Sequence, residues 1–149
     1  MKNKGFTLVE IIVVVAIVTV LTVVVSVSFS KFRKQQALQN TTNAITSILN
    51  EARTKTLSAY GNTYHSVKFE SNRVVLFVGG TYDSGVVTNE SYYYETPAIV
   101  SYSLQGGGSQ ISFDRLKGTT SQYGTITVSI SGIGSYTITV SSVGAIVRS

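Results

Sequence analysis

The chain has 149 residues, enough for one ordinary domain with a buried core. It contains no cysteine and a single histidine, which excludes disulfides, zinc–thiolate sites and thiol catalysis and argues against a histidine-built metal site. The net charge of +5 is unevenly distributed, because residues 61–149 carry five basic and five acidic side chains. The basic character therefore belongs to the first 60 residues, which argues against a globular surface that binds nucleic acid.

An apolar segment dominates the N-terminal part of the chain. Residues 8–29 read LVEIIVVVAIVTVLTVVVSVSF and carry one charged side chain, Glu10. As a helix this segment would be about 33 Å long, enough to cross a bilayer core, and it is too long for the apolar part of a signal peptide. It predicts a single-pass membrane anchor. Its flanking basic residues, two before and three after, do not set the orientation.

Glu10 needs an explanation, because an ionised carboxylate within an apolar segment is costly and is normally paired. The twenty residues that follow it contain no basic side chain. A cut after Gly5 would create a partner, since the α-amine of Phe6 would lie four residues from Glu10 and could also reach the Glu10 of a neighbouring subunit. The alternatives are a lone acid favoured by the helix dipole and an ordinary membrane anchor.

The sequence KGFTLVEIIVVVAIV at residues 4–18 resembles the class III signal of type IV prepilins and type II secretion pseudopilins. The matching positions are Lys4, Gly5, Phe6, Thr7, Leu8, Glu10 and the apolar stretch behind them. The resemblance implies that a prepilin peptidase removes the leader, residues 1–5, by cutting between Gly5 and Phe6, and then N-methylates Phe6. It also implies that Glu10 sets the register of assembly. Residues 6–29 would form the transmembrane and filament-core helix, with the head outside the cytoplasm.

Residues 30–60 are expected to continue this helix with an amphipathic pattern. Positions spaced by three, four and seven form one stripe: Leu38, Ile45, Ile48, Leu49, Ala52 and Thr56. With Gly61 as the first strong stop, we expect one helix from about residue 6 to 59, roughly 80 Å long if straight. A coiled coil over residues 38–56 is the alternative. Residues 6–60 lack the Gly or Pro that many pilins carry, and whether the Val-rich stretch 23–27 melts in a filament stays open.

Residues 61–149 form the head, whose pattern indicates β-structure. Alternation predicts a hairpin of strands 64–69 and 73–79, a loop at 79–85, an extended region over about 92–104 and short strands at 109–114 and 145–148. Pro97 favours an edge or a bulge in the extended region. The clearest pattern lies at 125–131 and 135–141, where Gly132 and Gly134 turn two half-buried antiparallel strands.

The hairpins and the alternating tail TITVSSVGAIVR resemble the heads of H-type minor pseudopilins and related minor pilins. This second resemblance rests on pattern and covers the β-rich part of the chain. It implies an α+β fold of the pilin type, in which the long N-terminal helix packs on an antiparallel β-sheet or a small β-sandwich.

Few side chains of the head suggest chemistry. Three basic residues are candidates for a small DNA-contacting patch: Arg115, Lys117 and Arg148. The neutral charge of the head favours plain surface positions for them. Asp83, Glu90 and Glu95 lie in loop-like sequence without the spacing of calcium ligands. Because His65 has no second histidine or cysteine, we expect no metal, no cofactor and no enzymatic activity.

These resemblances imply a structural subunit, a minor pilin or pseudopilin, of a type IV pilus, a type II secretion pseudopilus or a competence filament. Its expected partners are other pilin or pseudopilin subunits, the prepilin peptidase, the inner-membrane assembly platform and, before assembly, the lipid bilayer. We expect a single-pass protein of the cytoplasmic membrane that ends in a periplasmic or extracellular filament. The alternatives are a tip subunit whose head binds DNA or an exported protein, and a monomeric anchored protein.

Overall fold

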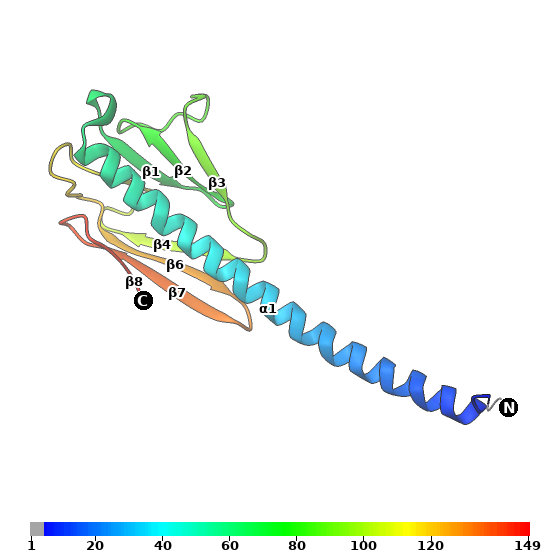
Figure 1. The fold of residues 1–149 in the computed structure, drawn as a ribbon. Helices are drawn as coiled ribbons and strands as arrows, with labels where there is room; N and C mark the ends of the chain where they lie inside the picture. Colours follow the sequence, from blue (N-terminus) through cyan, green and yellow to red (C-terminus); the bar gives the residue numbers. More distant parts are fainter. Residues whose placement is uncertain (1–4) are drawn as a thin grey trace.

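One long helix leads into a β-rich head. The computed structural model describes residues 5–149, apart from the side chains of residues 24–28. Helix α1 spans Leu8–Leu57, so the predicted continuous helix over residues 6–59 is confirmed with each end two residues further in. The first half of α1 projects away from the head and the second half lies along it (Figure 1).

The helix ends where the backbone turns left-handed. The amide of Ser58 still donates to the Thr54 carbonyl at 3.0 Å, but Ala59 has φ 49°. A short 3-10 turn, η1 (Tyr60–Asn62), follows and contains Gly61 at φ 68°. Gly61 was expected to stop the helix, but the left-handed Ala59 already ends the helical hydrogen bonding two residues earlier.

Two antiparallel sheets of four strands each pack on the second half of α1 (Figure 1). The first sheet has the order β3-β2-β1-β5, with β1 at His65–Phe69, β2 at Arg73–Val78, β3 at Glu90–Tyr93 and β5 at Gln110–Ser112. The second has the order β4-β6-β7-β8, with β4 at Ile99–Leu104, β6 at Gly124–Ile130, β7 at Gly134–Val140 and β8 at Ile146–Arg148. A long helix on antiparallel sheets confirms the expected α+β fold of the pilin type.

Both predicted hairpins are present. Val67 of β1 pairs with Leu76 of β2, and Ile126 of β6 pairs with Ile138 of β7. These four side chains are buried, as alternation requires when one face of a sheet covers the core. The expected short strands near residues 109–114 and 145–148 correspond to β5 and β8.

The prediction of a single extended region over residues 92–104 is wrong. Its two ends belong to different sheets, because β3 pairs with β2 whereas β4 pairs with β6. Pro97 lies in the connection between them, after a cis Thr96–Pro97 peptide bond. Proline has no amide hydrogen to donate to a strand ladder, so the chain leaves one sheet before Pro97 and joins the other after it.

The core lies between α1 and the inner faces of both sheets. From α1 it contains Ala37, Leu38, Ile45, Leu49 and Ala52, and from the strands it contains Val67, Phe69, Val74, Leu76, Ile111, Ile126, Val128, Ile130, Ile138 and Val140. The predicted stripe is confirmed, although Ile48 is only partly buried. Two buried hydroxyls also tie α1 to the head. Thr56 accepts from the His65 amide at 2.8 Å, and Thr41 accepts from the Glu95 amide at 3.2 Å.

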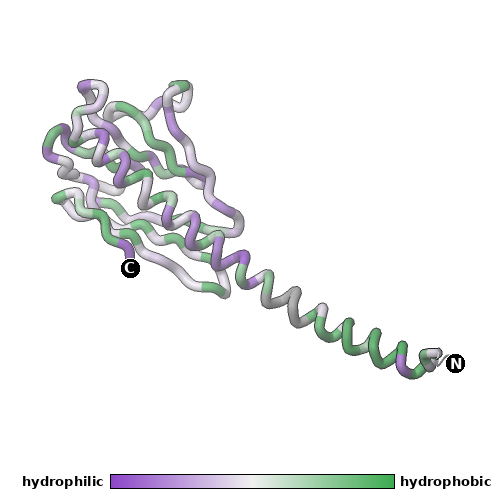
Figure 2. Tube along the Cα trace, viewed as in Figure 1, coloured by the Kyte–Doolittle hydropathy of each residue, from purple (hydrophilic) through white to green (hydrophobic). Residues whose placement is uncertain are grey.

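The hydropathy of α1 changes along its length (Figure 2). Apart from the grey stretch, the projecting part is coloured mostly apolar except near its start, and polar residues follow where α1 meets the head. Among the residues that the structure describes in full, no helix combines the length and the apolar content needed to cross a membrane. The segment expected to do so, residues 8–29, includes residues 24–28, whose side chains lie outside the description. Its membrane-spanning role stays a prediction.

Candidate functional site

Thr7 caps the start of α1. Its backbone is extended, with φ −82° and ψ 153°, and its Oγ1 accepts a hydrogen bond from the Glu10 amide at 3.3 Å. The Thr7 carbonyl accepts from the Ile11 amide at 3.3 Å. A threonine three residues before a glutamate, in front of an apolar run, is a sequence signature of a helix N-terminus. The cap could therefore have been predicted from Thr7 and Glu10, whereas Thr7 was considered above only as part of the prepilin resemblance.

Gly5 and Phe6 lie outside the helix, in accessible chain just before the Thr7 cap. Phe6 is 80% exposed, and among the described residues no atom beyond the adjacent ones lies within 4 Å of the position that a side chain on Gly5 would occupy. The Gly5–Phe6 bond is therefore accessible from solvent. A cut there would leave the cap intact and put the new α-amine of Phe6 directly before Thr7. The leader residues 1–4 lie outside the described residues.

Glu10 lies in the first turn of α1, where the unpaired amides of the helix favour a negative charge. All side chains from residue 5 to residue 23 are exposed, and Glu10 is the one charged group among them. An apolar surface of this size is unfavourable in contact with water, so lipid or other protein is expected to cover it. Once it is covered, an isolated carboxylate needs a cationic partner.

A cleft marks the neck, the place where α1 enters the head. It has a volume of about 610 Å³ and lies between residues 29–37 of α1 and the loop at residues 95–97. Two hydrogen bonds hold this loop on the helix: the amide of Glu95 donates to Thr41, and Asn40 Nδ2 donates to Glu95 Oε1 at 3.1 Å. No sequence pattern predicts this cleft, because it depends on where the β3–β4 connection crosses α1.

The structure does not gather the three basic candidates of the head into one patch. Arg148 donates to Asn43 Oδ1 at 2.6 Å, and its guanidinium lies 4.0 Å from the centre of the Tyr136 ring. Arg115 donates instead to Asn62, beyond the end of α1. The partners Asn43 and Asn62 are far apart, because most of the helical segment that packs on the head lies between them. A helix rises about 1.5 Å per residue. Lys117 is exposed in the same loop as Arg115.

The acidic candidates are also separated, and each is used locally. Asp83 Oδ1 accepts from the Gly85 amide at 2.8 Å, and Glu90 pairs with Lys55 at 2.8 Å. Glu95 is held by Asn40 at the neck. Within the described part of the chain, no group of three metal-ligating side chains comes together.

His65 is buried at the start of β1, and its Nδ1 has no hydrogen-bond partner in the described structure. Burial lowers the pKa of His65, and the positive charge of Lys55 adds to the effect. Its place in the core, behind the Thr56–His65 hydrogen bond, indicates a packing role.

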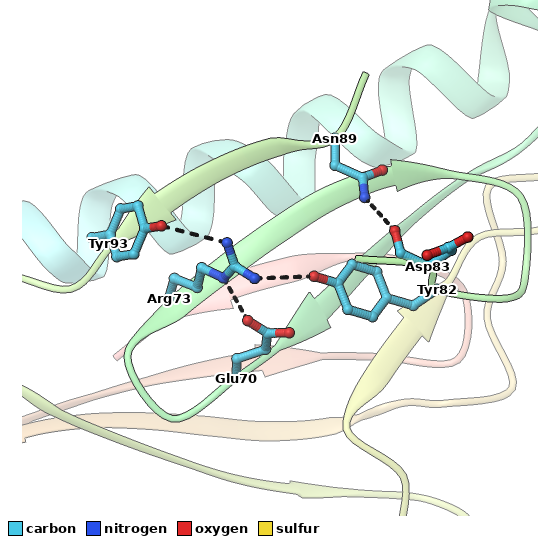
Figure 3. Close-up of polar contacts among 6 residues, drawn as sticks. All are labelled: Glu70, Arg73, Tyr82, Asp83, Asn89 and Tyr93. Carbon is cyan, nitrogen blue, oxygen red and sulfur yellow. Dashed lines mark hydrogen bonds and ion pairs between the residues drawn. The ribbon is translucent and has the colours of Figure 1, made fainter. Parts of the chain in front are cut away.

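A polar cluster lies on the outer side of the first sheet (Figure 3). Arg73 contacts the Glu70 carboxylate at 2.5 Å and donates to the hydroxyls of Tyr82 at 3.3 Å and Tyr93 at 3.4 Å. The Arg73 guanidinium lowers the pKa of Glu70. The Tyr82 ring packs edge-on against Phe77, 5.4 Å between centres. These contacts hold the β2–β3 loop, residues 79–89, against the sheet.

Two comparisons with known proteins agree with this geometry. Residues 1–26 match the family described as the prokaryotic N-terminal methylation motif. Among solved structures, the fold is similar to that of the type IV minor pilin FimU of Pseudomonas aeruginosa. The two chains share 15% identity and a TM-score of 0.59 over 79% of this chain and 92% of that one. No curated protein matches the sequence.

The chain thus combines an N-terminal methylation motif at residues 1–26 with a fold similar to that of a type IV minor pilin. The resemblance found in residues 4–18 is thereby confirmed. The likeness to FimU, at 15% identity, concerns the fold.

Proposed function

We propose that the protein is a structural subunit, not an enzyme, of a type IV pilus or a related filament. It is made as a membrane-anchored precursor and assembles through the first half of α1. The observation that carries this proposal is the capped start of α1, where the side chains from residue 5 to residue 23 are all exposed and Glu10 is the one charged group among them. Lipid covers that surface in the precursor, and the same half-helix of neighbouring subunits covers it in the filament.

The pairing of Glu10 follows from this change of surroundings. Cleavage by the prepilin peptidase between Gly5 and Phe6 creates an α-amine beside the start of α1, and N-methylation leaves its positive charge. When the half-helices pack together, the Phe6 amine of one subunit pairs with Glu10 of its neighbour or of its own chain. Either pairing neutralises a carboxylate that would otherwise be buried alone, which would cost several kcal/mol.

The same processing determines where the subunit is located and which proteins it contacts. The leader stays in the cytoplasm, the head lies outside, and the finished subunit sits in a periplasmic or extracellular filament. The partners are other pilin or pseudopilin subunits, the peptidase and the inner-membrane assembly platform. The fold shared with a minor pilin is compatible with a minor subunit, and counting copies along purified filaments measures that role.

N-terminal mass spectrometry and a Glu10→Gln variant test the proposal together. The exported chain is expected to begin at a methylated Phe6, in the wild type and in Glu10→Gln alike. The variant keeps the size of the side chain and loses its charge, so the fraction that pellets with filaments is expected to fall by about tenfold or more. Thr7→Ser, which keeps the cap, is the matched control and is expected to assemble normally. Retention of Met1–Gly5 would contradict the proposal, and normal assembly of Glu10→Gln would remove the pairing from it.

A further inference from the structure

The β2–β3 loop presents two valines in a fixed geometry. Tyr82 anchors one end of the loop on Phe77, and Asn89 Nδ2 closes the other end by donating to the Asp83 carbonyl at 2.7 Å (Figure 3). At the tip, Val86 is exposed and Val87 is 98% exposed. An apolar side chain held this far out gains nothing within its own molecule, whereas a partner with a matching pocket would bury it.

The neck cleft offers such a pocket. Its apolar walls come from Phe29, Ala37 and Pro97. Its charged lining is Arg33, Lys34 and Glu95, which leaves an excess of one positive charge. Both cations lack an ion-pair partner within the residues that the structure describes. A volume of about 610 Å³ is ample for the side chains of a loop tip.

The charges of the two features are complementary. Within the loop, residues 79–89, Asp83 is the one charged side chain. Glu90 follows the loop and is paired with Lys55 of the same molecule. An acidic loop facing Arg33 and Lys34 would gain Coulomb energy and would disfavour contacts between two loops or between two clefts.

The loop and the cleft lie at opposite ends of the head. The loop joins β3 at Glu90, which is bonded to Lys55 near the end of α1, whereas the cleft surrounds Arg33 and Lys34 (Figure 1). From Arg33 to Lys55 the helix rises about 33 Å, so one molecule cannot fill its own cleft. A second copy, shifted along the axis of α1, can place its loop in that cleft. Such a head-to-tail contact leaves a free loop at one end and a free cleft at the other, which generates an open filament.

We propose that Val86 and Val87 of one copy insert into the neck cleft of the next copy along the filament. This contact rests on the proposed function as a filament subunit and adds a second interface, between heads, to the one made by the half-helices. It also fixes an axial shift between the contacting copies, since the loop of one must reach Phe29, Ala37 and Pro97 of the other.

Because the chain has no cysteine, engineered pairs report this contact cleanly. In assembled filaments treated with a mild oxidant, the double variant Val87→Cys with Thr96→Cys is expected to give a ladder of disulfide-linked oligomers. The two Cβ atoms must come within about 4 Å for the bond to form. The matched control is Val143→Cys with Thr96→Cys. Val143 is exposed as well, to 63%, but it lies in another loop, between β7 and β8. The control is expected to give no ladder.

A second variant tests the energetic role of the contact without new bonds. Val87→Ser should leave the stability of the head unchanged, because the side chain has no neighbours to lose, and should reduce assembly about tenfold, as for loss of a well-packed interface anchor. Val143→Ser should assemble as the wild type does. Filaments without a Val87–Thr96 ladder, equal ladders from both pairs, or normal assembly of Val87→Ser would overturn this contact while leaving the proposed function standing. A wild-type chain that forms no filament with its own assembly machinery would overturn the proposed function as well.

Discussion

The two halves of α1 place their apolar side chains in opposite surroundings. Ile12, in the first half, is 59% exposed, whereas Ile45, in the second half, is completely buried under the sheets. The first half is apolar all round, and the second confines its apolar residues to one stripe. A stripe matches one flat surface, which the chain itself supplies, whereas a helix that is apolar on every side needs cover from many directions. The second half therefore stabilises the head, and the first half is available for lipid and neighbouring subunits.

The sharpest way to break this contrast is to shorten one isoleucine in each half. Ile45→Ala should lower the free energy of unfolding of the head by about 2–5 kcal/mol, because it opens a cavity in the core. Ile12→Ala should change it by less than about 0.5 kcal/mol. Urea unfolding of the full chain in mild detergent, followed by circular dichroism, measures both. Equal effects of the two substitutions would contradict the division of α1.

Acid should weaken the head and not the projecting half, because the one histidine is buried in the head. The folded-state pKa of His65 is lowered by burial and by Lys55, with Glu90 and Glu51 acting in the opposite direction. Below about pH 6.5 the unfolded chain binds a proton that the folded head resists, so stability falls as the pH drops through this value. Urea midpoints at pH 7.5 and 5.5 should show the loss in the wild type. The loss should largely disappear in His65→Leu, and an unchanged pH dependence in that variant would assign the effect to other groups.

The smallest expected effect sharpens the comparison at the start of α1. Thr7→Ala removes the cap and should weaken the first turn by about 1 kcal/mol, which corresponds to roughly fivefold faster amide exchange there. The urea midpoint of the head should not move, because Thr7 lies on the projecting half. Hydrogen-exchange mass spectrometry of the N-terminal peptide measures the change, with Thr7→Ser as the control. A shifted head midpoint would show that the two halves are coupled.

Local patterns in the sequence determined the long helix, its buried stripe and the hairpins β1–β2 and β6–β7. Each of these depends on residues close in the chain, whose periodicity of 3.6 or 2 shows which side faces the core. The prepilin-type motif was equally readable, because Gly5, Phe6, Thr7 and Glu10 lie within six consecutive residues around the first turn of α1. The helix cap at Thr7 belongs to the same turn and was open to prediction.

Only the tertiary structure decided how distant segments meet. The assignment of β3 and β4 to different sheets depends on pairing with β2 and β6, which periodicity does not encode. The neck cleft, the burial of Thr41 against the Glu95 amide and the separation of Arg148 from Arg115 all follow from that strand order. The physical reason is that hydrophobic periodicity specifies the buried face of an element, whereas the partner across that face is chosen by packing and hydrogen bonding between segments far apart in the chain.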